Sequence, residues 1–147
     1  IHKNLPILGV VYTPVLKKLY SAIVGKGAFL EFEQEKSPLK TSGTDIENSK
    51  VNVVASRSHI NEDTQKFIDQ YQEVEILSMG SSLKFMLIAE GKADVYPRIA
   101  PTMEWDTAAA QIVVTEAGGK VLNFDTKEPM QYNKENLLNP YFVVFNK

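Results

Sequence analysis

Asp106 is the residue whose surroundings point most clearly to chemistry. It lies in the run Trp105-Asp106-Thr107 and starts an alanine-rich stretch that favours a helix. Unpaired N–H groups at a helix N-terminus, together with the helix dipole, attract anions such as phosphate. A carboxylate beside that phosphate needs a cation between them, and hard oxygen ligands suit Mg²⁺. The spacing also fits a simpler role in which Asp106 caps the helix, so both interpretations stay open.

A second candidate anion site is the run Gly80-Ser81-Ser82-Leu83-Lys84. Ser82 and Lys84 would lie in the first turn of a predicted helix, where hydroxyl and ammonium donors can bind a phosphate. The run lacks the spacing of a P-loop. Serine caps and a solvated lysine are the simpler explanation of the same residues.

Further basic groups follow predicted strands. Arg57 and His59 come directly after a strand at residues 51–55, and Arg98 comes at the end of a strand at residues 93–96. Ligands of α/β folds bind where parallel strands end. A guanidinium can hold a phosphate through two parallel hydrogen bonds, and an imidazole can hydrogen-bond to a base or stack on it. A loop histidine without function is nevertheless the commoner case.

Glu104 and Asp106 stand two residues apart, so they can be considered as an acid and a base. Two acids in a loop are more often solvated surface. This spacing therefore carries only a weak prediction.

Composition narrows the classes of protein. The 147 residues suit one domain or one and a half, and 44% hydrophobic with 23% charged residues is typical of globular proteins. Sixteen basic and eighteen acidic residues give no positive excess for binding nucleic acid. The absence of cysteine excludes disulfides and thiolate metal sites and is compatible with a reducing compartment. We predict no transmembrane segment and a cytoplasmic protein, free or at the periphery of the inner membrane.

Patterns of apolar residues predict two kinds of architecture along the chain. Strands are expected at residues 7–13, 19–24, 28–32, 51–55, 74–77, 93–96, 120–124 and 141–145, and helices at residues 61–71, 81–90 and 106–117. The first three strands follow one another closely, which implies an antiparallel meander. The later strands alternate with helices. The predicted fold class is α/β with an α+β character at the N-terminal end, a meander followed by a mixed sheet with flanking helices.

A polar stretch at residues 36–50 has the composition of a connection. It predicts that residues 1–45 hold the remaining strands of a first antiparallel sheet and residues 46–147 form a C-terminal α/β domain. Residues 7–32 have no helix of their own to cover one face. Association of copies through that incomplete sheet, as a homo-oligomer, is therefore expected.

Several motifs follow one another in a fixed order. They are Gly9-Val10-Val11-Tyr12-x-Pro14, Tyr20-x-Ala22-x-x-Gly25-x-Gly27-Ala28, Trp105-Asp106-x-Ala108-Ala109 and Glu116-Ala117-Gly118-Gly119. Together they resemble the inositol monophosphatase superfamily of metal-dependent, lithium-sensitive phosphatases. Three further runs and the ending are similar to its CysQ-type 3′(2′),5′-bisphosphate nucleotidase branch: Ser56-Arg57-Ser58-His59, Gly80-Ser81-Ser82-Leu83-Lys84-Phe85, Ala93-Asp94-Val95-Tyr96-Pro97-Arg98 and Tyr132-Asn133-Lys134 with Leu138-Asn139-Pro140-x-Phe142.

The resemblance implies the C-terminal part of a layered α/β/α/β/α sugar-phosphatase fold. Members carry, further upstream, a Glu-Glu pair and an Asp-Pro-Leu/Ile-Asp-Gly-Thr motif that supply most metal ligands and position the attacking water. Neither motif occurs in this sequence. The catalytic residues are therefore unknown here and expected upstream of Ile1, and Asp106 is the one Mg²⁺ ligand that carries over.

The resemblance also implies a substrate and its binding residues. The activity would be Mg²⁺-dependent removal of the 3′-phosphate of adenosine 3′,5′-bisphosphate, a by-product of sulfur assimilation, to give AMP and phosphate. The residues expected to bind the nucleotide bisphosphate are Asp106, Thr107, Ser82, Lys84, Arg98, His59 and Arg57.

Alternative functions remain at this point. The 147 residues alone are expected to be inactive, because one metal carboxylate cannot fix a two-metal geometry. An inositol or sugar monophosphatase of the same superfamily is one alternative. A nucleotide-binding domain without catalysis is the other.

Overall fold

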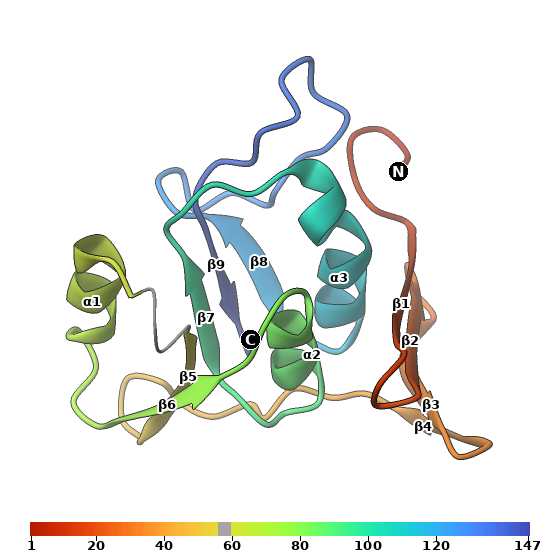
Figure 1. Cartoon of the computed structure of the whole chain (residues 1–147), viewed down its shortest axis with the longest axis horizontal. Coiled ribbons are helices and arrows are strands. Elements are labelled where there is room, and N and C mark those ends of the chain that lie inside the picture. The colour runs from red at the N-terminus through yellow and green to blue at the C-terminus, as the bar shows by residue number, and fades with distance from the viewer. Residues whose placement is uncertain (56–59) are drawn as a thin grey trace.

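The computed structural model describes residues 1–55 and 60–147. Within them, four layers follow one another: a first sheet, the helices α2 (Leu83–Ala89) and α3 (Glu104–Glu116), a second sheet, and the helix α1 (Glu62–Ile68) (Figure 1). The predicted α/β class, with a meander followed by a mixed sheet and flanking helices, is confirmed. None of these helices is both long enough and apolar enough to cross a bilayer.

The first sheet is antiparallel, and its strands lie side by side in chain order. They are β1 (Leu8–Thr13), β2 (Lys18–Ile23), β3 (Gly27–Phe32) and β4 (Glu35–Pro38). Gly25 and Gly27 have φ angles of 72° and 83° in the turn between β2 and β3. These left-handed conformations cost glycine little, which explains the turn that the sequence predicts there.

The strand β4 corrects the prediction of a connection beginning at residue 36. The chain folds back over Glu33 and Gln34, whose φ angles are 50° and 70°. Positive φ at both central residues is typical of a type I′ hairpin turn, but the usual Asn-Gly or Asp-Gly pair is missing. All four residues of β4 are exposed, so no apolar alternation marked the strand. The division at residue 45 stays a prediction.

The second sheet is mixed and has the strand order β6-β5-β7-β9-β8. Its strands are β5 (Val51–Ala55), β6 (Val74–Ser78), β7 (Val95–Arg98), β8 (Lys120–Asn123) and β9 (Phe142–Phe145). The strand β5 runs parallel to β6 and β7, whereas β9 runs antiparallel to both β7 and β8. The strand β7 lies two residues later than predicted, which makes Arg98 its last residue.

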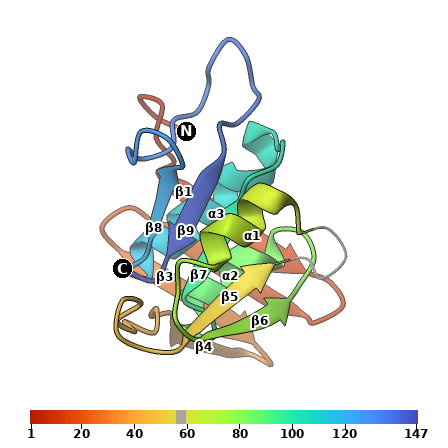
Figure 2. The same cartoon turned by 90° about the vertical axis from the view of Figure 1, so that its left-hand side faces the viewer.

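The main core lies between the two sheets, around α2 and α3. Contact between β1 and α3 is so close that a Cβ atom on Gly9 would lie 2.3 Å from the carbonyl oxygen of Ala109. The small size of Gly9 and Ala109 permits this approach. A second core covers the other face of the second sheet, where Phe67 and Ile68 of α1 pack (Figure 2).

The outer face of the first sheet carries apolar side chains. Leu8, Val10, Tyr12 and Ile23 all point to this face and are exposed. Among the described residues, no helix packs over them (Figure 1). Association of copies through this face stays a prediction.

Candidate functional site

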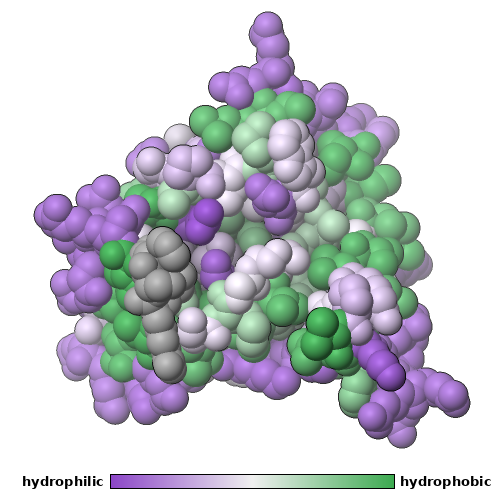
Figure 3. Space-filling model, in the orientation of Figure 1, coloured by the Kyte–Doolittle hydropathy of each residue, from purple (hydrophilic) through white to green (hydrophobic). Residues whose placement is uncertain are grey.

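A pocket of about 490 Å³ lies where the first turns of α2 and α3 meet the end of β7. Hydrophilic atoms show in a hollow on this face of the molecule (Figure 3). Five of the residues predicted from the sequence line the pocket: Ser82, Lys84, Arg98, Asp106 and Thr107. Val10 and Val11 of β1 also contribute, and the exposed Trp105 stands beside them. The fold therefore brings together residues from three separate segments of the sequence, near positions 10, 80 and 100.

Lys84 is the least expected feature of this pocket, because a charged side chain is only 7% exposed. It makes no ion pair with the described residues, and its ammonium lies 5.3 Å from the ring centre of Tyr96. Burial, followed by the positive charge of Arg98, lowers the pKa of Lys84 below its ordinary value. A buried ammonium costs free energy unless an anion pairs with it. The simpler explanation of a solvated lysine is therefore wrong.

Arg98 adds a second cation to the same wall. One terminal nitrogen donates to the carbonyl oxygen of Pro101 at 3.2 Å, and the buried Nε has no hydrogen-bond partner among the described residues. An unsatisfied donor of this kind is costly and indicates a missing acceptor. Lys84 and Arg98 together present the donors that a phosphate group accepts from.

Ser82 occupies the position before the first residue of α2, but its side chain makes no capping hydrogen bond. The Ser82 side chain therefore does not cap α2, and the simpler explanation of a serine cap is wrong for this residue. Ser82 lines the pocket together with Lys84.

Asp106 takes part in the capping of α3 and also lines the pocket. Met103, not Asp106, holds the capping position, so α3 starts two residues earlier than predicted. One carboxylate oxygen of Asp106, Oδ2, accepts a hydrogen bond from the backbone N–H of Met103 at 2.8 Å. The other oxygen has no hydrogen-bond partner among the described residues, which leaves it available to a cation in the pocket. The two interpretations left open by the sequence are therefore compatible.

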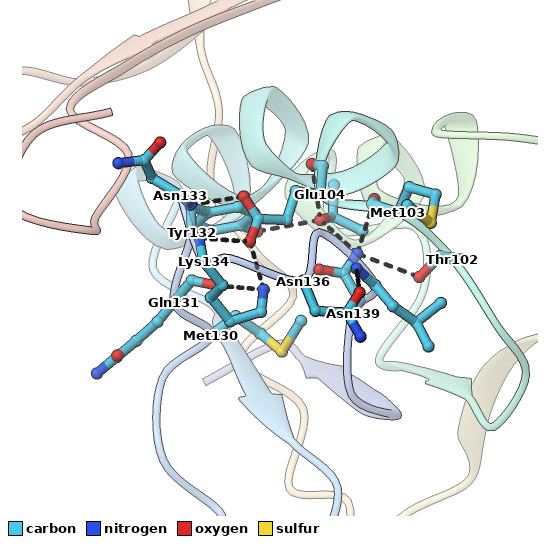
Figure 4. Close-up of polar contacts among 12 residues, drawn as sticks. Thr102, Met103, Glu104, Met130, Gln131, Tyr132, Asn133, Lys134, Asn136 and Asn139 are labelled. Atoms are coloured by element: carbon cyan, nitrogen blue, oxygen red, sulfur yellow. Dashed lines mark hydrogen bonds and ion pairs between the residues drawn. The ribbon is translucent and has the colours of Figure 1, made fainter.

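Glu104 does not pair with Asp106 as an acid and a base. Its buried carboxylate turns away from the pocket and accepts hydrogen bonds from the backbone N–H groups of Asn133, at 2.6 Å, and Lys134, at 3.2 Å (Figure 4). The Lys134 ammonium forms an ion pair with the same carboxylate. Burial alone would raise the pKa of Glu104, but these donors outweigh it and lower the pKa below its ordinary value. The weak acid-base prediction is wrong for this reason.

Thr107 lines the pocket, but its hydroxyl is engaged inside the protein. It donates to the carbonyl oxygen of Glu104 at 3.3 Å and lies 3.1 Å from Asn139 Nδ2 and 3.2 Å from the Tyr132 hydroxyl. The side chain is 1% exposed. Any contact of Thr107 with a ligand is therefore left to its other atoms.

Two predicted residues, Arg57 and His59, lie outside the described residues. The sequence reasoning also missed groups that shape the site. Tyr96 was quoted only within a motif, yet it lines the pocket, and burial raises its pKa to about 12. Tyr132 and Asn139 were also only motif members, and the structure places both under the first turn of α3. The motif itself was the signal available for them.

Two sheets with helices between them, and a pocket lined by cationic side chains where α2, α3 and β7 meet, define an α/β protein with a candidate anion site, and comparison identifies its family. Residues 1–142 match the Inositol monophosphatase family, so the chain belongs to that family. The crystal structure of CysQ from Bacteroides thetaiotaomicron, a bacterial member of the inositol monophosphatase family, is similar. It superposes with a TM-score of 0.87 at 40% identity, over 100% of this chain and 60% of that one.

Other relatives fit the same picture. The 3′(2′),5′-bisphosphate nucleotidase CysQ of Escherichia coli strain K12 is 41% identical over 148 residues, which cover 95% of this chain and 54% of the relative. The inositol monophosphatase of Anabaena superposes with a TM-score of 0.73 at 27% identity, over 97% of this chain and 57% of that one. The chain thus spans about half the length of the curated relatives that it matches.

Proposed function

We propose that the protein to which this chain belongs is a metal-dependent phosphatase that removes the 3′-phosphate of adenosine 3′,5′-bisphosphate, giving AMP and phosphate. The observation that carries the proposal is that the buried Lys84, the partly buried Arg98 and one available carboxylate share a single pocket of about 490 Å³. A substrate with two phosphates needs two kinds of anion site. Relatives named as 3′(2′),5′-bisphosphate nucleotidases support this choice of substrate.

Lys84 and Arg98 bind the phosphate that is not cleaved. Lys84 is buried without an ion pair among the described residues, and Arg98 has an unsatisfied Nε. A phosphate dianion supplies the missing acceptors and offsets the repulsion between the two cations. The Ser82 hydroxyl adds a neutral donor. Arg57 and His59 stay predictions for the same nucleotide.

Asp106 is the residue that would hold a metal ion. Its available oxygen faces the pocket, and a single carboxylate with substrate phosphate and water is an ordinary ligand set for Mg²⁺. A bound divalent cation would neutralise phosphate charge and lower the pKa of water. The hydrogen bond from Met103 N–H fixes the orientation of the carboxylate before any ligand arrives.

Catalysis requires more acidic groups than the described residues bring to the pocket. Asp106 is the one carboxylate among its lining residues, and the described part of the chain holds no group of three His, Cys, Asp or Glu side chains suited to a metal. We expect the 147 residues alone to bind the nucleotide but to release phosphate slowly or not at all. Cytoplasmic location stays a prediction.

Calorimetric titration with adenosine 3′,5′-bisphosphate, with and without Mg²⁺, tests the proposal. We expect Mg²⁺ to strengthen binding to the chain, and Asp106→Asn to remove that strengthening. Asp63→Asn is the matched control, because Asp63 also lies in the first turn of a helix but outside the pocket. It should titrate like the unchanged chain.

Other outcomes assign other functions. Mg²⁺-independent binding that Lys84→Met abolishes would favour a nucleotide-binding domain without catalysis. Equal affinity for an inositol monophosphate would move the substrate to that class. Robust phosphate release by the 147 residues alone would contradict the requirement for further carboxylates.

A further inference from the structure

Glu104 fastens a distant loop to the first turn of α3. Its carboxylate accepts the N–H groups of Asn133 and Lys134 and pairs with the Lys134 ammonium (Figure 4). In return, the backbone N–H of Glu104 donates to the carbonyl oxygen of Leu137 at 3.0 Å. The side chain and the backbone of one residue therefore hold the loop at two points.

A second set of hydrogen bonds continues from this loop into the helix. Asn139 Nδ2 donates to the carbonyl oxygen of Met103 at 2.8 Å and to the Thr107 hydroxyl at 3.1 Å. The Tyr132 hydroxyl donates to Gln111 Oε1 at 2.7 Å and lies next to the same Thr107 hydroxyl. Tyr132 and Thr107 are almost fully buried, so these bonds are shielded from water.

The bonded residues alternate with residues that face the pocket. Glu104 and Thr107 hold the loop, while Asp106 lies between them in the same helical turn and lines the pocket. Met103 receives the Asn139 amide on its carbonyl and donates its N–H to Asp106. A shift of the loop would therefore move the group to which Asp106 is bonded.

From this geometry we infer that Glu104 is a positioning residue, which fixes the Asp106 carboxylate in the pocket through the loop at residues 130–139. The expected effect of Glu104 on ligand affinity rests on the proposed function. The expected effect of Glu104 on the order of the first turn of α3 is independent of that function.

The closing experiment compares two glutamates of α3. Glu116 is the matched control, because its carboxylate accepts the N–H groups of Gly25 and Gly27, at 3.0 and 2.9 Å, at the far end of the helix. Glu104→Gln and Glu116→Gln each remove one charge that holds two backbone donors. Amide hydrogen exchange without ligand and calorimetric titration with adenosine 3′,5′-bisphosphate and Mg²⁺ are measured on both variants of the 147-residue chain.

We expect Glu104→Gln to speed amide exchange of Asp106 and Thr107 about tenfold. The Mg²⁺-dependent affinity should fall roughly tenfold, as when an outer partner of a metal ligand is removed. Glu116→Gln should change neither quantity at the pocket. If Glu104→Gln proves too unstable, Lys134→Met keeps the backbone bonds and should show the same local pattern at smaller size.

The results separate the two proposals. Exchange at Asp106 and Thr107 that is unchanged in Glu104→Gln, or equally fast in Glu116→Gln, would overturn the positioning role. Local exchange that responds to Glu104→Gln, in a chain that fails to bind the nucleotide, would support the positioning role and contradict the proposed function.

Discussion

The same kind of contact is found at both ends of α3, but the surroundings of the two ends differ. At each end a glutamate accepts two backbone N–H groups from a loop distant in the sequence, Glu104 from residues 133–134 and Glu116 from Gly25 and Gly27. Beside Glu104 lies a pocket with two cations, the buried Lys84 and the partly buried Arg98. Beside Glu116 lies close packing, where a Cβ atom on Gly119 would meet the carbonyl oxygen of Phe145 at 2.6 Å.

This difference teaches that contact chemistry alone does not mark a functional residue. Both carboxylates satisfy backbone N–H donors, as folding generally requires. Glu104 differs because its helical turn also carries Asp106. Asp106 lines the same pocket as Lys84 and Arg98. The predictions below test that distinction by disturbing one end at a time.

The largest expected effect comes from adding a methyl group at two closely packed glycines, Gly9 against the middle of α3 and Gly119 just after its C-terminal end. Gly9→Ala would place Cβ 2.3 Å from the Ala109 carbonyl oxygen, and Gly119→Ala would place it 2.6 Å from that of Phe145. Backbone must shift in both, so we expect each to lower the free energy of unfolding by about 2–3 kcal/mol. Urea denaturation followed by circular dichroism measures this loss.

Nucleotide binding is the measurement that distinguishes Gly9→Ala from Gly119→Ala. Ala109 lines the pocket, and Gly119 does not. Gly9→Ala should therefore also weaken binding of adenosine 3′,5′-bisphosphate, while Gly119→Ala should bind it normally below its melting temperature. Equal weakening by both would mean that the pocket responds to general stability rather than to the seating of α3.

Glu90 provides a purely structural counterpart whose effect depends on pH. Its buried carboxylate ends α2 and accepts from Tyr20, Lys92 and, at 3.1 Å, Lys18. Burial would raise its pKa, but the hydrogen bonds from Lys92, Tyr20 and Lys18 lower it below 4.5. At neutral pH we expect Glu90→Gln to cost about 1–2 kcal/mol.

The sign of the pH dependence follows from that lowered pKa. The unfolded chain takes up the proton first as pH falls, so the stabilisation is present above pH 4.5 and is lost below it. The stability difference between the unchanged chain and Glu90→Gln should shrink in acid. A difference that stays constant down to pH 3 would show that the charge of Glu90 contributes nothing. Nucleotide binding at neutral pH should be the same in both.

Asp106 allows its two roles to be separated. Asp106→Ala removes the hydrogen bond from Met103 N–H and should cost about 1 kcal/mol of stability. Asp106→Asn keeps an acceptor there, so its stability should change by less than about 0.5 kcal/mol. Thermal melting without ligand measures both. A loss of stability in Asp106→Asn as large as in Asp106→Ala would mean that the carboxylate charge, rather than the cap, stabilises the helix.

Sequence reasoning was most successful where one residue type has one physical explanation. The predicted helix at residues 61–71 begins with Asn61, a residue type favoured as a helix cap, and its side chain accepts the N–H of Thr64 at 2.8 Å. The strand at residues 51–55 was placed correctly because its apolar run is buried on both faces. Lys84 and Arg98 were found as candidates, but the burial of Lys84 was not, because it depends on how α2 packs against β7.

The remaining features depend on contacts that a linear pattern does not contain. Exposed β4 is held by pairing with β3 and carries no apolar signal. Glu104 resembled a solvated acid, because the donors that surround it come from about 30 residues further along the chain. Its burial follows from the path of the loop at residues 130–139, which local propensity does not fix.

Lys84→Met is the last prediction and the only one expected to raise stability. Burial and the charge of Arg98 lower the pKa of Lys84, so the folded chain holds that proton less tightly than the unfolded chain does. An apolar side chain of similar length removes this cost, and we expect a gain of about 0.5–1 kcal/mol at neutral pH. Because the unfolded chain binds more protons, the penalty in the unchanged chain should fade as pH approaches 10.5, and the two proteins should converge there.

Lys36→Met, at an exposed lysine outside the pocket, is the control and should give no such gain. Added inorganic phosphate should stabilise the unchanged chain and not Lys84→Met, because only the former retains the buried cation. A destabilised Lys84→Met would mean that the ammonium already has a partner in the folded chain. In that case the pocket end of α3 would be as fully paired as the Glu116 end.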